Sequence, residues 1–154
     1  MIQLIDFRST CPKFIRKGNL FALENTVDIT IRYKTQYCFK TRNIILNKGF
    51  LTNGYHVPKA LLFLAPRILE TGDEDTVAEY NAPILIYQAL NDLGGFSGFT
   101  KKEAKEIFYE MVERSFAPKM RLYVARACTS IFSDDSLAWG YDFLDNASLI
   151  TIST

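Results

Sequence analysis

The alternation of apolar and polar residues from Val27 to Lys34 constrains the fold of this chain more than any other feature. Val27, Ile29, Ile31 and Tyr33 alternate with polar or charged residues. A period of two places the apolar side chains on one face of an extended segment, and β-branched residues favour that conformation. The pattern predicts a half-buried β-strand that has to pack its apolar face against another layer.

Further strands are predicted on both sides of this one. Tyr37–Leu46 is a second strand candidate, and the short connection Lys34–Gln36 predicts an antiparallel hairpin. Gln3–Phe7 and Leu20–Leu23 carry weaker strand patterns. Leu149–Ser153 is also strand-like, and it could add to an edge of its own sheet or of a neighbouring molecule's sheet.

The chain changes character after Pro58, where helical patterns begin. Lys59–Leu64 is a short apolar helix candidate, and Thr76–Leu93 reads as a helix in which Pro83 either starts a segment or kinks it. Pro118 can open a further helix through Cys128. Gly94 and Gly95 are expected to end the Thr76–Leu93 helix.

The clearest helix start is the capping box Thr100-Lys101-Lys102-Glu103. In this motif the Thr hydroxyl and the Glu carboxylate each accept a hydrogen bond from a backbone N–H that the helix leaves without a partner. Apolar residues then follow at helical spacing, at Ala104, Ile107, Phe108, Met111 and Val112.

These patterns predict an α+β fold: an N-terminal antiparallel β-sheet or hairpins, followed by a C-terminal part of three to four helices. We expect a single domain over residues 1–154, because a chain of this length fits one core. Its parts are a β-rich segment 1–58, a helical segment 59–131 and an acidic tail 132–154.

Charge is unevenly distributed, although the net charge is only +1. The first 48 residues carry nine Lys or Arg against three Asp or Glu, whereas no Lys or Arg follows Arg126 and the tail holds four Asp. The basic and acidic ends could attract each other within one chain or head to tail between copies. They could also be ordinary solvated faces. The small net charge predicts no nucleic-acid partner.

Composition argues against several chemistries. The chain has one histidine, and its cysteines, Cys11, Cys38 and Cys128, form no C-x-x-C pair, so we expect neither a metal nor a cofactor. Packed free thiols are the expected state of these cysteines. The N-terminus does not resemble a signal peptide, and no apolar run approaches the length of a membrane span, so we expect no membrane insertion.

The one histidine lies in the stretch Gly49–Pro58, which follows the second strand candidate. Thr52-Asn53-Gly54 suits a tight turn, because Asn and Gly tolerate positive φ. We predict that this loop is a contact surface, formed by Thr52, Asn53, Tyr55, His56 and Pro58. A turn histidine bonded to local backbone is the plain alternative for His56.

The stretch Gly49–Lys59 resembles the G-F-x-T-D-x-x-S-x-P-R motif of a phage and prophage family, domain of unknown function thirteen-fifty-three. Ala82–Leu90 falls where that family has a helix ending in H-D-x-L-Y. Thr100–Phe108 resembles the start of a later helix of the family. The resemblance spans about Ile44 to Arg126, in the same order.

The departures from the family pattern share a direction. Where the family has a loop Asp and a Ser, this chain has Asn53 and His56. Where the family has a His-Asp pair, this chain has Ile86-Tyr87, and Lys105 replaces a further Asp. An amide cannot supply the charge of a carboxylate, and an isoleucine cannot bind a metal. If the family site is catalytic, the resemblance implies that this chain has lost it.

The resemblance, the lost polar positions, the aromatic content and the charge distribution favour a non-enzymatic bacteriophage virion protein. It would be a structural or adaptor component of a tail, neck or baseplate, made in the bacterial cytoplasm. Its partners would be other phage structural proteins or further copies of itself. The alternatives are a phage-encoded protein that binds a host target and, less favoured, a small hydrolase that uses His56 with Asn53 and a carboxylate such as Glu79.

Overall fold

The computed structural model describes residues 2–18, 20–52, 74–114, 139–142 and 144–154. Strands come first and two α-helices follow, which is the predicted α+β arrangement. In chain order, the elements are β1 Gln3–Ser9, β2 Phe14–Lys17, β3 Leu20–Leu23, β4 Val27–Lys34, β5 Phe39–Leu46, β6 Leu51–Thr52, α1 Glu74–Leu93, the 3-10 turn η2 Gly94–Ser97, α2 Lys101–Arg114, the 3-10 turn η3 Ala147–Leu149, and β7 Ile150–Ser153.

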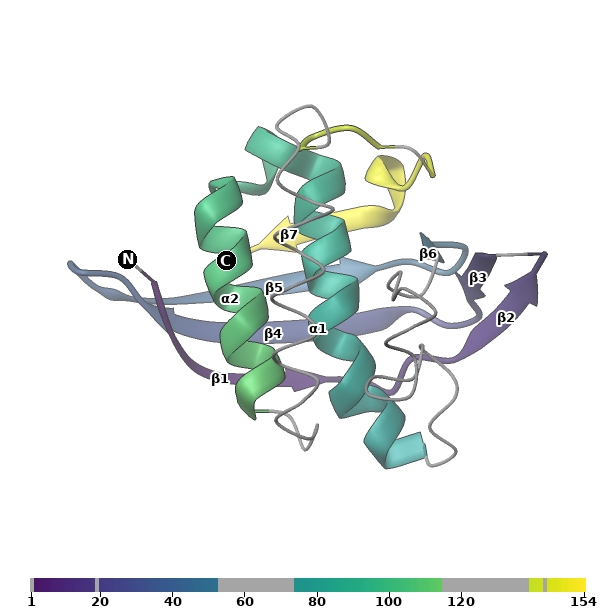
Figure 1. The fold of residues 1–154 in the computed structure, drawn as a ribbon, viewed down its shortest axis with the longest axis horizontal. Coiled ribbons are helices and arrows are strands. Elements are labelled where there is room, and N and C mark those ends of the chain that lie inside the picture. Colours follow the sequence, from purple (N-terminus) through teal and green to yellow (C-terminus); the bar gives the residue numbers. More distant parts are fainter. Residues whose placement is uncertain (1, 19, 53–73, 115–138, 143) are drawn as a thin grey trace, which may run out of the picture.

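The main layer is a four-stranded sheet in the order β1-β4-β5-β7, in which every neighbouring pair is antiparallel. Helices α1 and α2 cover one face of it (Figure 1). A smaller sheet, β2-β3-β6, lies at one end of the molecule, and the hairpin between β4 and β5 reaches the other end (Figure 1).

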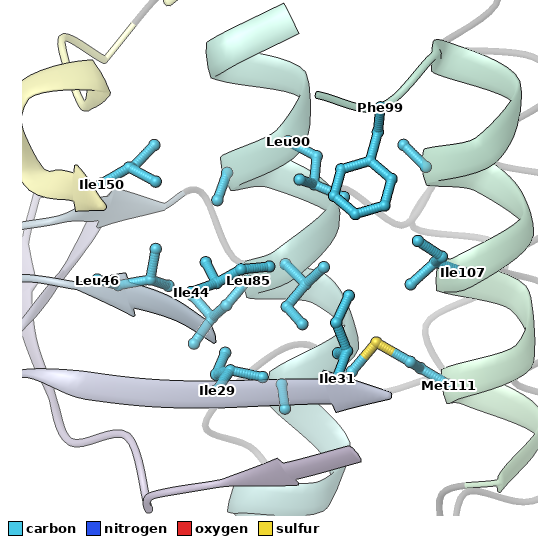
Figure 2. Packing of buried hydrophobic residues seen from close by; sticks show 14 of the residues in the cluster. Ile29, Ile31, Ile44, Leu46, Leu85, Leu90, Phe99, Ile107, Met111 and Ile150 are labelled. Carbon is cyan, nitrogen blue, oxygen red and sulfur yellow. The ribbon is translucent and has the colours of Figure 1, made fainter. Parts of the chain in front are cut away.

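The alternating residues of β4 behave as predicted. Val27, Ile29, Ile31 and Tyr33 are all buried, while Arg32 and the other residues between and after them are exposed or half-buried. The buried residues pack against side chains from β5, β7 and both helices (Figure 2). Burying one such side chain contributes about 1.5–3 kcal/mol to folding, so the four buried residues of β4 stabilise the fold substantially.

The predicted hairpin is confirmed, although β5 begins two residues later than predicted. The chain turns over four residues, Thr35–Cys38, and the N–H of Thr35 donates to the carbonyl of Cys38 at 2.9 Å. Cys38 is therefore exposed at the turn, and the prediction of a packed thiol is wrong for it. Cys11 is half-buried, and Cys128 lies outside the described residues.

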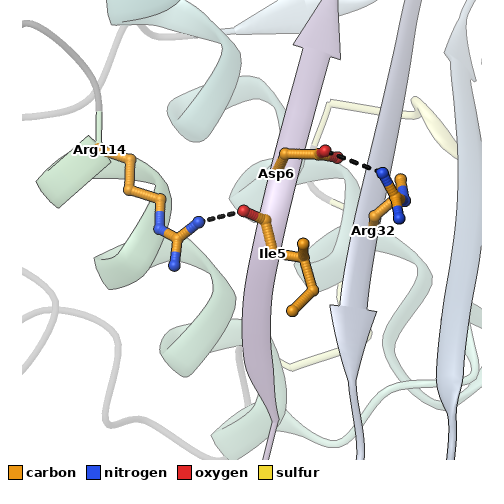
Figure 3. A network of polar contacts seen from close by, with 4 residues as sticks. All are labelled: Ile5, Asp6, Arg32 and Arg114. Carbon is orange, nitrogen blue, oxygen red and sulfur yellow. Dashed lines mark hydrogen bonds and ion pairs between the residues drawn. The ribbon is translucent and has the colours of Figure 1, made fainter.

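The edge strand β1 is covered by charged side chains of α2. The N–H of Ile2 donates to Glu106 Oε2 at 3.2 Å, and the N–H of Leu4 donates to Glu110. Arg114 then donates to the carbonyl of Ile5 (Figure 3). A helix rises about 6 Å over four residues, and a strand advances about 6.7 Å over two residues. Side chains spaced four residues apart on α2 can therefore reach successive backbone groups of β1. They give partners to backbone groups that an edge strand otherwise leaves without one.

The helix α1 begins two residues earlier than predicted, so Glu74 and Asp75 are helical rather than part of a loop. Pro83 lies inside this helix and does not start a new segment. The helix ends at Leu93, just before Gly94, as predicted.

The capping box is confirmed at the start of α2. The N–H of Glu103 donates to Thr100 Oγ1 at 3.1 Å, and the N–H of Thr100 donates to Glu103 Oε1 at 2.9 Å. Along the helix, the predicted apolar face is buried at Ala104, Ile107, Phe108 and Met111.

Two expectations about element number need correction. The described part of the chain holds two α-helices rather than three or four, and the helices predicted over Lys59–Leu64 and from Pro118 to Cys128 lie outside it. Strands β2 and β6 were not predicted; β6 has only two residues and cannot show a period. The predicted C-terminal strand is β7, and it adds to the edge of its own sheet.

None of the helices described here combines the length and apolar character needed to cross a membrane.

Candidate functional site

Only one residue of the predicted contact loop lies in the described part of the chain. Thr52 ends β6, pairs with Phe21 of β3 and is fully buried. Asn53, Tyr55, His56 and Pro58 lie outside the described residues, so the loop surface stays a prediction.

The base of this loop is held in place by backbone contacts. The N–H of Gly49 donates to the carbonyl of Leu23 at 2.9 Å, and the N–H of Leu23 donates to the carbonyl of Phe50 at 2.9 Å. Gly49 has a φ of 97°, a conformation that residues with a side chain rarely adopt. A turn at Gly49 therefore directs the chain into β6.

A buried asparagine from the C-terminal segment binds β6. Asn146 Oδ1 accepts from the N–H of Leu51 at 2.9 Å, and Asn146 Nδ2 donates to the carbonyl of Leu51 at 2.8 Å. Gln88 Nε2, from α1, donates to the same carbonyl at 2.6 Å. The amide of Asn146 thus serves both backbone groups of Leu51, as a neighbouring strand would.

The same amide reaches the end of helix α1. Asn146 Nδ2 donates to Asp92 Oδ2 at 3.1 Å, and Asp92 is only 9% exposed. The pKa of Asp92 is raised from 3.8 to about 6, chiefly by burial and also by the nearby charge of Asp142, against the opposing effect of hydrogen bonds from Asn146 and Gln88. This carboxyl group changes its charge close to neutral pH.

Asp142 fixes the backbone around Asn146. Its Oδ1 accepts from the N–H of Asn146 at 2.7 Å, and its Oδ2 accepts from the N–H of Ala147 at 2.6 Å. Both carboxylate oxygens therefore order the turn that leads into β7. We call Asp92, Asp142, Asn146 and Gln88 the polar clasp, because together they join α1, β6 and the C-terminal segment.

The hydrogen bonds of the polar clasp, as far as the structure describes the chain, join it to itself and to nearby backbone. These backbone groups belong to Leu51, Asn146 and Ala147. Within the described residues, no three His, Cys, Asp or Glu side chains are grouped so that they could hold a metal ion. The clasp is a structural device that positions the base of the Gly49–Pro58 loop.

The sequence did not reveal the polar clasp. Asp142 was noted only as one charge of the acidic tail. Asn146 and Leu51 are 95 positions apart, and Leu51 occupies a position of the G-F-x-T-D-x-x-S-x-P-R motif that can be any residue. No local pattern could have joined them.

Of the family's polar positions, the structure describes three, at Ile86, Tyr87 and Lys105, and only the first of them is fully buried. Ile86 is fully buried in the core between the helices and the sheet. The ring of Tyr87 lies 4.9 Å from that of Phe108, centroid to centroid. Lys105 is half-buried on α2.

A second surface stands out at the β4–β5 turn. Tyr37 and Phe39 are 86% and 70% exposed, although large aromatic side chains are usually at least partly covered. Lys34 Nζ lies 5.6 Å from the centroid of the Phe39 ring, which is a cation–π contact. We call Lys34, Tyr37, Phe39 and Lys40 the hairpin tip.

Comparison of the chain with protein-family models, with curated proteins and with solved structures finds no match. The resemblance to the phage family therefore stays a prediction, and the assignment of function depends on the residues themselves.

Proposed function

We propose that this chain is a non-enzymatic bacteriophage virion protein, a structural or adaptor subunit of a tail, neck or baseplate. It acts through contacts with other phage structural proteins or with further copies of itself. The observation that carries the proposal is the hairpin tip, where two aromatic side chains remain exposed at one end of the molecule. Exposed aromatics are enriched in protein–protein interfaces and costly to leave in water.

The position of Ile86 supports a role without catalysis. The resemblance places a His-Asp pair at Ile86 and Tyr87, and in this chain Ile86 is fully buried among apolar side chains. A buried isoleucine can neither transfer a proton nor bind a metal. The scaffold around that position is kept by packing alone, as expected for a protein that works through its surfaces.

Mass spectrometry of purified phage particles tests the proposal. We expect peptides of this chain at a fixed copy number relative to the major capsid protein, after a density gradient that removes abundant host proteins. A host cytoplasmic protein followed through the same gradient is the control for contamination. Absence from the particle would contradict the proposal and favour the alternative of a host-binding protein, which affinity capture from host lysate would then test.

A further inference from the structure

The hairpin tip is held rigidly. Thr35 Oγ1 accepts from the N–H of Cys38 at 3.2 Å and from the N–H of Tyr37 at 3.3 Å. The pairing of β4 with β5 continues up to Lys34 and Phe39, the two residues that flank the turn. Ordering a loop on binding lowers affinity, so a turn that is already ordered presents its aromatic side chains at little further entropic cost.

Near the tip, the two strands of the hairpin themselves carry only positive charge. Between Ile29 and Asn47 the sequence has two Lys and two Arg and no acidic residue. In the part of the chain that the structure describes, only Arg32 of these four forms an ion pair, with Asp6 at 3.1 Å (Figure 3). A partner that covers the tip should therefore carry negative charge, and its surface should be able to pack against aromatic rings.

The chain carries such a surface itself, in its C-terminal segment. Tyr141 is 55% exposed, Asp145 is exposed, and Asp142 is half-buried beside them. No Lys or Arg occurs anywhere after Arg126. Figure 1 places the hairpin tip at one end of the long axis, whereas the segment before β7 lies on the far side of α1 from it. The described contacts include none between the tip and this segment.

We infer that copies of this chain associate head to tail, with the hairpin tip of one copy on the surface that Tyr141 and Asp145 form on the next. The inference deepens the proposed function, because it names a second copy as the partner. The two surfaces differ and lie apart, so a docked pair keeps one unoccupied tip, on one copy, and one unoccupied acidic surface, on the other. Such a heterologous contact produces rings or filaments rather than closed two-fold dimers.

Sedimentation velocity of the full chain over a range of concentrations tests the association. We expect species larger than a dimer at about 50 mM salt and weaker association at about 500 mM, because exposed charges are screened. The double variant Tyr37→Ser/Phe39→Ser should weaken association by at least about tenfold. Ile15→Thr, which alters an exposed apolar residue on β2, should leave it unchanged.

A mixing experiment separates a head-to-tail contact from a symmetric one. The tip variant keeps its acidic surface, and a second variant, Tyr141→Ser/Asp145→Asn, keeps its tip. Asn suits position 145, where φ is 57°. Each variant alone should be monomeric, and an equimolar mixture should form dimers that grow no further, because only one intact pair of surfaces is available. Circular dichroism of each variant checks that it is folded.

Three results would overturn the inference. They are a wild-type chain that stays monomeric at every concentration, association that persists in the tip variant, and a mixture that forms no dimers. Nucleic acid that copurifies with wild type but not with the tip variant, in a monomeric protein, would assign the tip to nucleic acid instead. Detection of the chain in virions does not depend on these results, so the failure of this inference is distinguishable from failure of the proposed function.

Discussion

Asn146 and Asp92 are separated by 54 positions in the sequence, yet Asn146 Nδ2 donates to Asp92 Oδ2 at 3.1 Å in the folded chain. Through this bond the C-terminal segment reaches the end of α1, and through Leu51 it reaches the base of the Gly49–Pro58 loop. The position of Leu51, at the base of the loop, therefore depends on a contact that forms only when the C-terminal segment has come together with α1 and β6.

Replacing Asp92 with Asn should stabilise the protein at neutral pH. The pKa of Asp92 is about 6 in the folded state, against 3.8 ordinarily, so the folded state holds the proton more tightly than the unfolded chain between those values. Stability supplied by this group is greatest below pH 4 and is lost as the pH rises through 6. Asp92→Asn removes that loss, and we expect a gain of about 2 kcal/mol at pH 7.5.

Urea denaturation from pH 4 to pH 8 measures this effect as the difference between variant and wild type. The difference should grow between pH 4 and pH 6 and then level off. Asp28→Asn, on the outer side of β4, removes a carboxylate outside the polar clasp and is the control for net charge. A variant less stable than wild type at pH 7.5 would mean that the charge of Asp92 stabilises the polar clasp.

Replacing Asn146 with Ala should cost about 1–3 kcal/mol, because the N–H of Leu51 loses its partner, whereas the carbonyl of Leu51 keeps the hydrogen bond from Gln88. Chemical denaturation at pH 7.5 measures the loss. Ser148→Ala changes an exposed side chain of the same segment and should be nearly neutral. If the two substitutions had equal effects, the hydrogen bonds of Asn146 would not stabilise the folded state.

The features predicted from the sequence are those whose physical cause is local. The strand β4 follows from its period of two, and the start of α2 follows from a hydrogen-bonding motif that spans four residues. Both signals depend on neighbours along the chain, so tertiary contacts were not needed to read them.

The features that escaped prediction depend on contacts between distant segments or on a single turn. Cys38 is exposed because the side chain of Thr35 bonds the backbone of the turn and ends the strand pairing there, a detail that apolar periodicity does not contain. The partner of Leu51 is an amide 95 positions away. The two-residue strand β6 is too short for any pattern.

Replacing Thr100 with Ala should destabilise the protein by about 1 kcal/mol, since the first turn of α2 loses an acceptor for the N–H of Glu103. Thermal or urea denaturation measures it. Combining Thr100→Ala with Glu103→Ala should cost less than the sum of the two single changes, because the two bonds are made reciprocally. Lys102→Ala, at an exposed position of the same turn, is the control, and strict additivity would contradict a shared capping box.

Replacing Gly94 with Ala should be much more damaging than the same change at Gly98. Both glycines have positive φ, 56° and 79°, so both substitutions carry the backbone cost of about 1 kcal/mol. At Gly98 an added Cβ meets open space, whereas at Gly94 it would lie 2.5 Å from the Cα of Gly140. Gly140 is held there by its N–H, which donates to the carbonyl of Asn91 at 2.7 Å. The C-terminal segment therefore has to move away from α1 in Gly94→Ala, which should also disturb Asn146 and β6.

We expect Gly94→Ala to lose about 2 kcal/mol or more beyond the loss in Gly98→Ala, because backbone atoms on both sides resist the displacement. Hydrogen exchange provides the second measurement: the N–H of Leu51 should exchange faster in Gly94→Ala and at the wild-type rate in Gly98→Ala when both are corrected for global stability. Equal losses in the two variants would contradict the close approach of Gly140 to Gly94. The hydrogen bond between Asn146 and Asp92 would then not depend on that approach.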